Sequence, residues 1–304
     1  MNSSIYIIIP VHNRRLCTLA CLENLRHQDI INRYKIIVVD DASTDGTSDV
    51  VRERYPEVEI LVGDGNLWWT GAIVKGMEYA VSKDADYLIW LNDDCLPQKG
   101  SIQTLLNACQ NNPSAIVGGQ SLDPDTLEPS YGGLIRTKSQ VLPVHASKGE
   151  CISCDALSGN FVCIPSRTVK LIDYPDNQRF PHYYSDAVYT YGAKLKGCQI
   201  IVIGEAIALC RQDHLYLPSV KYWLENNDSP VLLWEAFLSI KSPHHWSSEF
   251  EFYRAFFGIA GLFFYARDRI LRFFLITLIV SLIPLKLRVR LIPLFYLIKS
   301  VVTH

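Results

Sequence analysis

Short apolar runs alternate with segments of helical periodicity along residues 5–119. The first run, Ile5–Ile9, is apolar throughout and ends at Pro10, which is typical of a strand buried on both faces. Leucines then recur at helical spacing from Leu16 to Leu25. Later segments also alternate between a short apolar run and residues at helical spacing. Strands are therefore expected at residues 5–9, 35–40, 58–63, 87–91 and 115–119, and helices at 16–25, after 45, at 70–82 and at 101–109.

Strands separated by helices predict an α/β protein with a doubly wound, mostly parallel sheet. In such sheets ligands bind at the carboxyl ends of the strands. Two of the expected strands end in paired carboxylates, Asp40-Asp41 and Asp93-Asp94, so an acidic site is expected at that edge. The segment 123–151 is rich in Pro, Gly and Ser and is expected to form loops or a short hairpin.

The composition is that of a folded protein with an uneven distribution of charge. Of 304 residues, 49% are hydrophobic and 20% are charged, which allows a sizeable core and excludes a disordered chain. The net charge of −2 gives no reason to expect a nucleic-acid partner. Residues 255–304 contain seven Lys/Arg and one Asp/Glu, a net +6, so residues 1–254 carry −8. An acidic body is thus followed by a basic tail.

The basic tail is also strongly apolar. Apolar runs of 12, 13 and 8 residues occupy 255–266, 273–285 and 291–298. Each is shorter than the roughly 20 residues of a membrane-spanning helix. Apolar runs separated by basic residues predict helices that lie in a membrane interface and are attracted to anionic lipid. The alternative is a buried helical subdomain. We therefore expect two parts, residues 1–254 and residues 255–304.

The cysteines and the N-terminus indicate a cytosolic protein. Of nine cysteines only Cys151 and Cys154 form a CxxC pair, and no second pair or His pair stands at zinc spacing. Reduced thiols are therefore expected, with a zinc site as the alternative. The segment MNSSIYIIIP has no basic region and too short an apolar run for a signal peptide. The protein is therefore expected in the cytosol, at the inner face of the cell membrane.

Six motifs follow one another in an order that resembles a known family. Together they resemble an inverting, family-2-type glycosyltransferase with the GT-A nucleotide-diphospho-sugar transferase fold, of the kind that builds bacterial cell-surface polysaccharides. The resemblance extends over residues 5–204, and each motif alone is weak. The motifs are PVHNR (10–14), VVDDASTDGT (38–47), GDGNLWWTGA (63–72), WLNDDC (90–95), SGNF (158–161) and FPHYYSDAVYTYGAKLKG (180–197).

The resemblance implies a nucleotide pocket at the ends of the first two strands. Pro10, Val11 and Asn13 would line this pocket. Asp41 would accept a hydrogen bond from the imide N–H of a pyrimidine, a task that suits a carboxylate because it only accepts. Asp40 would support the loop. Taken alone, DDASTDG is also typical of an exposed turn followed by a helix cap.

A glycine-rich loop with two tryptophans would complete the donor site. Trp68 or Trp69 would form the floor of the sugar pocket, because aromatic faces stack on sugar C–H faces, while the other would pack in the core. Asn66 would hydrogen-bond donor groups. Gly65, Gly71 and Gly159 would allow the backbone to approach the ligand closely.

Asp93 and Asp94 resemble the metal-binding carboxylates of the family. Asp94 is expected to ligate Mg²⁺ or Mn²⁺, which would neutralise the charge that develops on the leaving diphosphate. The motif here is Asn92-Asp93-Asp94 and departs from the spaced D-x-D form, so the division of labour within the pair stays open. A plain acidic turn is the alternative.

Asp186 lies where the family has its catalytic base. It would take the proton of the acceptor hydroxyl as that oxygen attacks the anomeric carbon, which inverts the configuration in one displacement. His182 and Tyr183 would orient the acceptor. The alternatives are a helix N-terminal cap for Asp186 and an ordinary packed histidine for His182.

The resulting hypothesis is transfer of one hexose or deoxyhexose from a UDP- or dTDP-sugar to a saccharide acceptor, expected to be lipid-linked. The chain lacks the Q-x-x-R-W segment of processive synthases, which favours single additions. One alternative is a sugar-1-phosphate nucleotidyltransferase, but PVHNRR has no glycine to hold a triphosphate. Another is a non-catalytic, membrane-associated protein that binds sugar nucleotides, which the combination of Asp41, Asp94 and Asp186 argues against.

Overall fold

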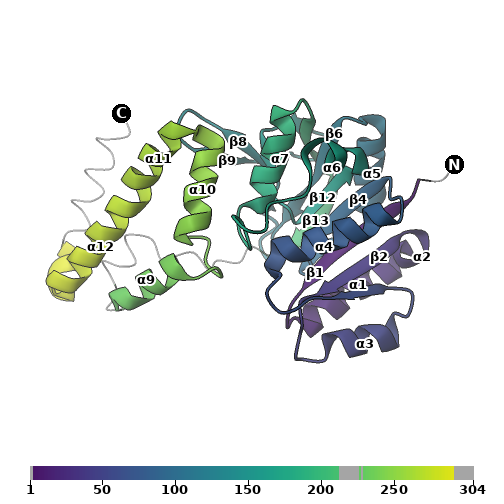
Figure 1. The fold of residues 1–304 in the computed structure, drawn as a ribbon, viewed down its shortest axis with the longest axis horizontal. Helices are drawn as coiled ribbons and strands as arrows, with labels where there is room; N and C mark the ends of the chain where they lie inside the picture. The colour runs from purple at the N-terminus through teal and green to yellow at the C-terminus, as the bar shows by residue number, and fades with distance from the viewer. Residues whose placement is uncertain (1–2, 212–225, 227–228, 291–304) are drawn as a thin grey trace. The chain divides into compact units, whose positions relative to one another are not determined.

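The computed structural model describes residues 3–211, 226 and 229–290 (Figure 1). The chain divides into two compact units, Met1–Gln212 and Asp213–His304. This division comes earlier in the chain than the one at 254/255 that we expected from composition. The two units are described separately below.

The first unit is built on a mixed, mostly parallel sheet. Its strands lie in the order β10-β13-β6-β12-β4-β1-β2-β3, and β5 and β7 pair with β13 and β6. The strands are β1 (Ile5–Val11), β2 (Lys35–Asp40), β3 (Glu59–Val62), β4 (Tyr87–Leu91), β5 (Cys95–Pro97), β6 (Ala115–Leu122), β7 (Pro129–Tyr131), β10 (Cys151–Ser153), β12 (Phe161–Pro165) and β13 (Gln199–Cys210).

The predicted α/β class and mostly parallel sheet are confirmed. β4, β1, β2 and β3 are parallel neighbours, and β13 is parallel to β6. β12 runs antiparallel between β4 and β6, which the sequence pattern did not predict. The segment expected to hold a short hairpin contains β8 (Gly133–Arg136) and β9 (Val141–Val144), which pair with each other, and β8 also pairs with β11 (Ala156–Leu157).

Helices cover both faces of the main sheet, which explains the continuous apolar runs. Ile7 and Ile9 belong to one core cluster and Ile8 to the other, because successive side chains of a strand point to opposite faces. The helices are α1 (Arg15–His27), α2 (Ile30–Arg33), α3 (Thr47–Arg54), α4 (Trp68–Ser82), α5 (Ser101–Asn111), α6 (Ser166–Ile172) and α7 (Ser185–Leu195).

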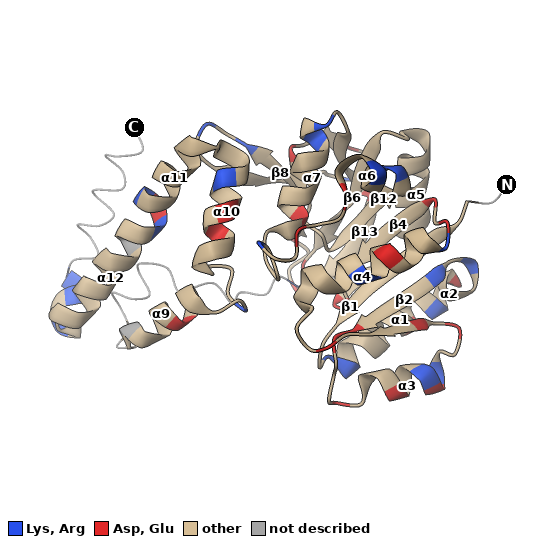
Figure 2. Ribbon diagram, in the orientation of Figure 1, with Lys and Arg blue, Asp and Glu red and all other residues tan. Residues whose placement is uncertain are grey.

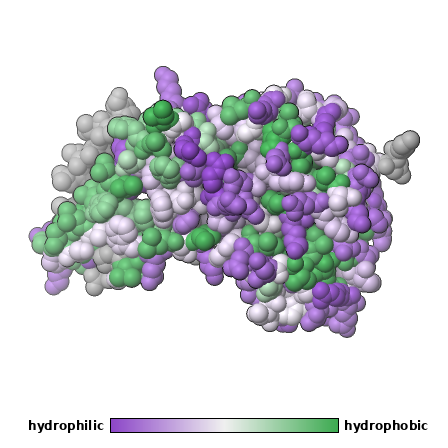
Figure 3. All heavy atoms as spheres, viewed as in Figure 1, coloured by the Kyte–Doolittle hydropathy of each residue, from purple (hydrophilic) through white to green (hydrophobic). Residues whose placement is uncertain are grey.

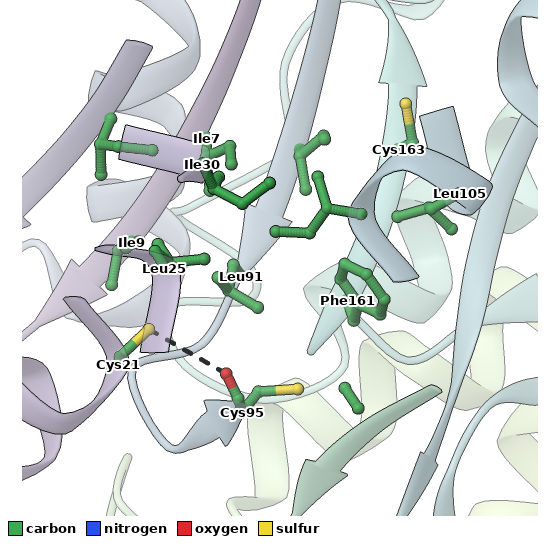
Figure 4. Packing of buried hydrophobic residues seen from close by; sticks show 14 of the residues in the cluster. Ile7, Ile9, Cys21, Leu25, Ile30, Leu91, Cys95, Leu105, Phe161 and Cys163 are labelled. Carbon is green, nitrogen blue, oxygen red and sulfur yellow. Dashed lines mark hydrogen bonds between the residues drawn. The ribbon is translucent and has the colours of Figure 1, made fainter. Parts of the chain in front are cut away.

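The core on the α1 face is assembled from distant parts of the chain (Figure 4). Leu25 of α1 lies beside Ile9 of β1 and Leu91 of β4, and Leu105 of α5 lies near Phe161 of β12. On the other face, the second cluster takes residues from α4, α6 and α7. Packing on both faces holds the strand ends, and hence the loops that follow them, in a fixed arrangement.

The second unit is helical. It contains α9 (Pro230–Leu238), α10 (Trp246–Phe257), α11 (Ile259–Tyr265), the π-helix η1 (Ala266–Ile270) and α12 (Leu271–Leu282). Leu233 of α9 is buried against Phe273 and Ile276 of α12. Glu249 of α10 is buried and forms an ion pair with Arg269 of η1, with Nε and Oε1 2.6 Å apart. The unit therefore begins before the apolar tail, because α9 and α10 pack with the helices of the tail.

No helix among the described residues is both long and apolar enough to cross a membrane. The apolar runs 255–266 and 273–285 lie within α10 to α12 and the turn after α12, whereas the run 291–298 lies outside the described residues.

We expect Leu25→Ala to lower the free energy of unfolding by about 2–5 kcal/mol, because it leaves a cavity in the core. Leu16, on the same helix, is 78% exposed, so Leu16→Ala is the matched control and should change stability by less than about 0.5 kcal/mol. Urea unfolding followed by circular dichroism measures both. Equal effects of the two substitutions would contradict the packing of α1.

Candidate active site

The candidate site lies at the carboxyl ends of β1, β2 and β4. Since β1 is the central strand of these three, the segments that follow them lie side by side. His12 and Asn13 follow β1, Asp41 follows β2, and the segment 92–94 follows β4. The acidic strand ends that the sequence places far apart are therefore neighbours.

Asp40 and Asp41 are both buried, and each has its own set of hydrogen-bond donors. Asp40 accepts from the backbone N–H of Ser43 at 2.9 Å and from the hydroxyl of Ser48. Asp41 accepts from the backbone N–H of Gly65 through Oδ1 at 2.7 Å and from that of Trp68 through Oδ2 at 3.0 Å. Both charges are compensated by hydrogen bonds to different loops, so adjacent carboxylates can be held at one strand end.

The segment after β1 is bound to the segment after β2. His12 Nδ1 lies 2.6 Å from the carbonyl oxygen of Asp41, so this nitrogen carries the proton and donates. His12 Nε2 then accepts from the side-chain amide of Asn13 at 3.0 Å, and Asn13 Oδ1 accepts from the N–H of Thr44 at 2.7 Å. This chain of hydrogen bonds assigns the neutral Nδ1–H tautomer to His12 and fixes the first part of the predicted nucleotide pocket.

The glycine-rich loop approaches Asp41 closely. A Cβ at Gly63 would overlap Oδ1 of Asp41, so a side chain cannot fit there. Trp68 has a φ of 55°, which is unfavourable for a bulky residue, and its N–H donates to Asp41. The hydrogen bond therefore helps to hold Trp68 in this conformation. Asn66 is exposed, and Gly71 lies in the first turn of α4 near Leu67.

The two tryptophans have different environments. Trp69 donates from Nε1 to Oδ1 of Asn92 at 2.8 Å and packs edge-on against Trp90, with ring centroids 5.7 Å apart. Trp68 lies against His182, with centroids 5.9 Å apart, and His182 lies against Tyr183. Trp69 is thus part of the packing between α4 and β4, and Trp68 belongs to an aromatic group next to α7.

Asp93 and Asp94 share one arginine. Arg14 donates from Nη2 to Oδ2 of Asp94 at 2.7 Å, and its Nε lies 3.3 Å from Oδ1 of Asp93. Burial raises the pKa of Asp93 to about 7, although Arg14 and the hydroxyl of Thr18 favour the charged form. Burial lowers the pKa of Arg14, but the two carboxylates more than offset this and raise it. The three side chains form one charged cluster at the end of β4.

Asp186 lies in the first turn of α7. Its Oδ2 accepts from the N–H of Gly159 at 2.6 Å and its Oδ1 from that of Ala187 at 2.8 Å. Burial raises the pKa of Asp186 even though these hydrogen bonds favour the carboxylate. A Cβ at Gly159 would lie 2.8 Å from Cβ of Asp186 and 2.7 Å from the Trp69 ring, so this position requires glycine.

The SGN turn connects Asp186 to the carboxylates after β4. Gly159 bonds to Asp186, and the carbonyl oxygen of the next residue, Asn160, accepts from the N–H of Asn92 at 3.0 Å. The structure thereby brings the predicted base and the predicted metal-binding carboxylates into one connected site. Pro10 and Val11, predicted to line the nucleotide pocket, are buried residues of β1.

The donor set after β4 suits a divalent cation that shares its shell with phosphate. Among the described residues, no group of three His, Cys, Asp or Glu side chains could hold a metal ion by itself. Mg²⁺ and Mn²⁺ are commonly bound by one or two carboxylates together with substrate phosphates, which is what Asp93 and Asp94 offer. His214, the other ligand considered from the sequence, lies outside the described residues.

Sequence reasoning gave no role to Arg14 or Asn92. The sequence did contain a signal for the contact of Arg14 with the carboxylates. Arg14 comes shortly after the first strand, and Asp93-Asp94 come shortly after the fourth. The sequence could not show that these strands are adjacent.

The fold is that of the GT-A class. The model of the family Glycosyl transferase family 2 matches residues 6–149, so the resemblance expected from the motifs is confirmed. Glycosyltransferase AglE of Haloferax volcanii is 28% identical over 117 residues, which are 37% of this chain and 38% of AglE. The aligned region thus spans well under half of this relative.

Solved structures show the same fold at low identity. S. aureus TarS 1–349 in complex with UDP superposes with a TM-score of 0.55 at 15% identity, over 87% of this chain and 75% of that one. GalNAc-T7 with UDP, GalNAc and Mn²⁺ gives a TM-score of 0.57 at 13% identity, over 93% of this chain and 58% of that one. These similarities confirm the predicted GT-A fold.

The raised pKa of Asp93 predicts that the metal-free protein loses stability as pH rises from about 4 to about 7. In that range the folded state keeps the proton of Asp93, with a pKa of about 7, while the unfolded state, with a pKa of about 3.9, has lost it. The free energy of unfolding should therefore fall with a component of up to about 1.4 kcal/mol per pH unit.

Urea unfolding in EDTA at several pH values measures this slope. Asp93→Asn should remove the component, and Asp84→Asn, at an exposed position, is the control that should retain it. A slope unchanged in Asp93→Asn would show that Asp93 is not the group responsible.

Proposed function

We propose that the protein is an inverting, metal-dependent glycosyltransferase that moves one sugar from a UDP- or dTDP-sugar to a hydroxyl of a saccharide. The observation that carries the proposal is the connected arrangement of Asp41, Asp94 and Asp186 along one edge of the sheet. The family match over residues 6–149 supports the same class of reaction. The TarS and GalNAc-T7 complexes contain UDP, which supports a uridine or related pyrimidine nucleotide as the donor's carrier.

The donor is held by the segments after β1 and β2. Each carboxylate oxygen of Asp41 accepts one backbone hydrogen bond and has a further lone pair. That lone pair suits the imide N–H of uracil or thymine. Pro10, Val11, Asn13 and Asp40 support this pocket. Trp68 and Asn66, on the neighbouring loop, are the proposed contacts for the donor sugar.

Asp186 is the proposed base. Two N–H groups fix the direction of its carboxylate, and burial raises its pKa toward the range in which a carboxylate accepts a proton effectively. His182 and Tyr183 precede it and form an aromatic pair with centroids 4.7 Å apart, which suits contact with an acceptor sugar. Asp94, with Asp93, is the proposed ligand of Mg²⁺ or Mn²⁺, which when bound neutralises charge on the leaving diphosphate.

The helical unit is the proposed contact with the inner face of the membrane. Large apolar side chains of α12 are exposed at helical spacing, while the opposite side of this helix packs on α9. Figure 3 shows hydrophobic residues gathered on this unit, and Figure 2 shows Lys and Arg near both ends of α12. A lipid-linked saccharide is the acceptor that this arrangement favours. The exposed residues are Leu271, Phe274, Leu275, Leu278 and Leu282.

Two variants should distinguish the residue needed for nucleotide binding from the residue needed for catalysis. UDP or dTDP with Mn²⁺ should raise the Tm of the wild-type protein, since a ligand that binds only the folded state stabilises it. Asp94→Ala should lose this rise, because the metal ligand is gone. Asp186→Asn should keep the rise but lower turnover by about 10²–10⁴-fold.

Thermal unfolding with a panel of nucleotides measures the first effect, and release of UDP in the presence of acceptor measures the second. A wild-type protein that no nucleotide stabilises, or an Asp186→Asn variant with normal turnover, would contradict the proposal.

If the helical unit contacts the membrane as proposed, the protein should bind to vesicles that contain phosphatidylglycerol. Replacing Phe274 and Leu278 together by Glu should weaken this binding by more than about tenfold, because two apolar contacts worth about 1.5–3 kcal/mol each are lost. Leu195→Glu is the control, since Leu195 is 68% exposed on α7 of the first unit. Co-sedimentation measures the bound fraction. Equal binding by the double variant and the wild type would exclude α12 as the contact.

A further inference from the structure

Arg14 lies where a cation would be expected to bind. Its guanidinium contacts Oδ2 of Asp94 at 2.7 Å and Oδ1 of Asp93 at 3.3 Å, so one positive charge bridges both carboxylates. The side chain of Asp93 is 5% exposed and that of Asp94 23% exposed, whereas that of Arg14 is 39% exposed. The carboxylates are thus held by the protein, and the arginine reaches them from the open side.

The next residue, Arg15, shows that this contact is specific. Its N–H donates to Oδ2 of Asp45 at 2.9 Å and its Nη1 to the carbonyl oxygen of Asp45 at 2.8 Å. Arg15 therefore supports the loop after β2, and only Arg14 of this pair of neighbours contacts the carboxylates after β4.

Two adjacent carboxylates, Asp93 buried and Asp94 partly exposed, need a positive charge. The burial of Asp93 and the repulsion between the two carboxylates both disfavour the doubly charged state, and Arg14 offsets part of that cost. A divalent cation would compensate the pair more fully, but it would compete with the guanidinium for the same oxygens. A metal on these carboxylates would lie close to the guanidinium, and the repulsion between the two positive charges weakens metal binding unless the guanidinium moves away.

A nucleoside diphosphate supplies another partner for Arg14. The planar guanidinium matches phosphate oxygens, and the side chain of Arg14 is long and 39% exposed, so a diphosphate that shares the metal would lie within its reach. Without a diphosphate, a cation would displace Arg14 into water with no new partner.

We propose that Arg14 is a positioning residue that acts as a built-in counter-cation. Its guanidinium neutralises the Asp93–Asp94 pair in the empty site and moves to the diphosphate when metal and nucleotide bind together. The inference rests on the proposed function, because it takes Asp94 to be the metal ligand. Its consequence is strong coupling: the metal binds weakly alone, and nucleotide and metal increase each other's affinity by the same factor.

The test is titration of the full-length protein with Mn²⁺, with and without UDP, followed by electron paramagnetic resonance of free Mn²⁺. Arg14→Met removes the charge and keeps the length of the side chain. It should bind Mn²⁺ alone about 10- to 100-fold more tightly than the wild type, the factor that corresponds to a lost charged hydrogen bond. The factor by which UDP tightens Mn²⁺ binding should fall by a similar amount.

Three further variants complete the design. Arg52→Met, at an exposed position of α3, is the control for removal of an arginine charge and should behave like the wild type. Arg14→Lys keeps the charge and should keep Mn²⁺ binding weak in the absence of UDP, and Arg14→Gln replaces Arg14→Met if that variant does not fold. In EDTA, Arg14→Met should have a lower Tm than the wild type, and Mn²⁺ alone should restore it.

The outcomes distinguish this inference from the proposed function. If the wild-type protein binds no Mn²⁺ even with UDP, the proposed metal site is wrong. If the wild type binds Mn²⁺ with UDP but neither Arg14→Met nor Arg14→Gln binds Mn²⁺ alone more tightly than the wild type, only the role of Arg14 is overturned.

Discussion

The compensation of negative charge at one edge of the sheet is the constraint on which the site depends. Two strand ends carry adjacent carboxylates, and at least three of these side chains are buried. Asp40 and Asp41 are compensated by hydrogen bonds from nearby loops. The donors are backbone N–H groups, whose directions the chain fixes, and for Asp40 also the hydroxyl of Ser48. Asp93 and Asp94 are compensated by Arg14, a long and partly exposed side chain.

This difference separates a permanent part of the site from an exchangeable one. The hydrogen bonds of Asp41 bind the segment after β2 to the loop before α4, and the side chains of His12 and Asn13 add the segment after β1. A pocket built in this way is preorganised for a ligand. The carboxylates after β4 are held by the charge of a single side chain, and the proposed role of Arg14 is that a cation arriving with its substrate takes its place.

The order of the strands was only partly accessible from the sequence. Hydrophobic periodicity depends on neighbours in the chain, so the strands predicted at 5–9 and 35–40 and the helix predicted at 70–82 are present. The structure extends the first strand through Pro10 to Val11 and begins the helix at Trp68. The antiparallel strand Phe161–Pro165 has the same apolar pattern as a parallel one, because both of its faces are buried. Its place between β4 and β6 depends on pairing between residues far apart in the chain. The packing of α9 on α12 likewise joins residues far apart in the chain, which the change of composition at residue 255 does not reveal.

By itself the sequence determined the local elements, the types of side chain at each strand end and the resemblance carried by six motifs. Only the tertiary structure decided which strand ends are neighbours, and with them the contacts of Arg14 with Asp93 and Asp94 and of Asp186 with Gly159. The physical reason is that periodicity and capping act over a few residues. Electrostatic compensation and hydrogen bonding between loops depend on distances that the packing of helices against the sheet sets.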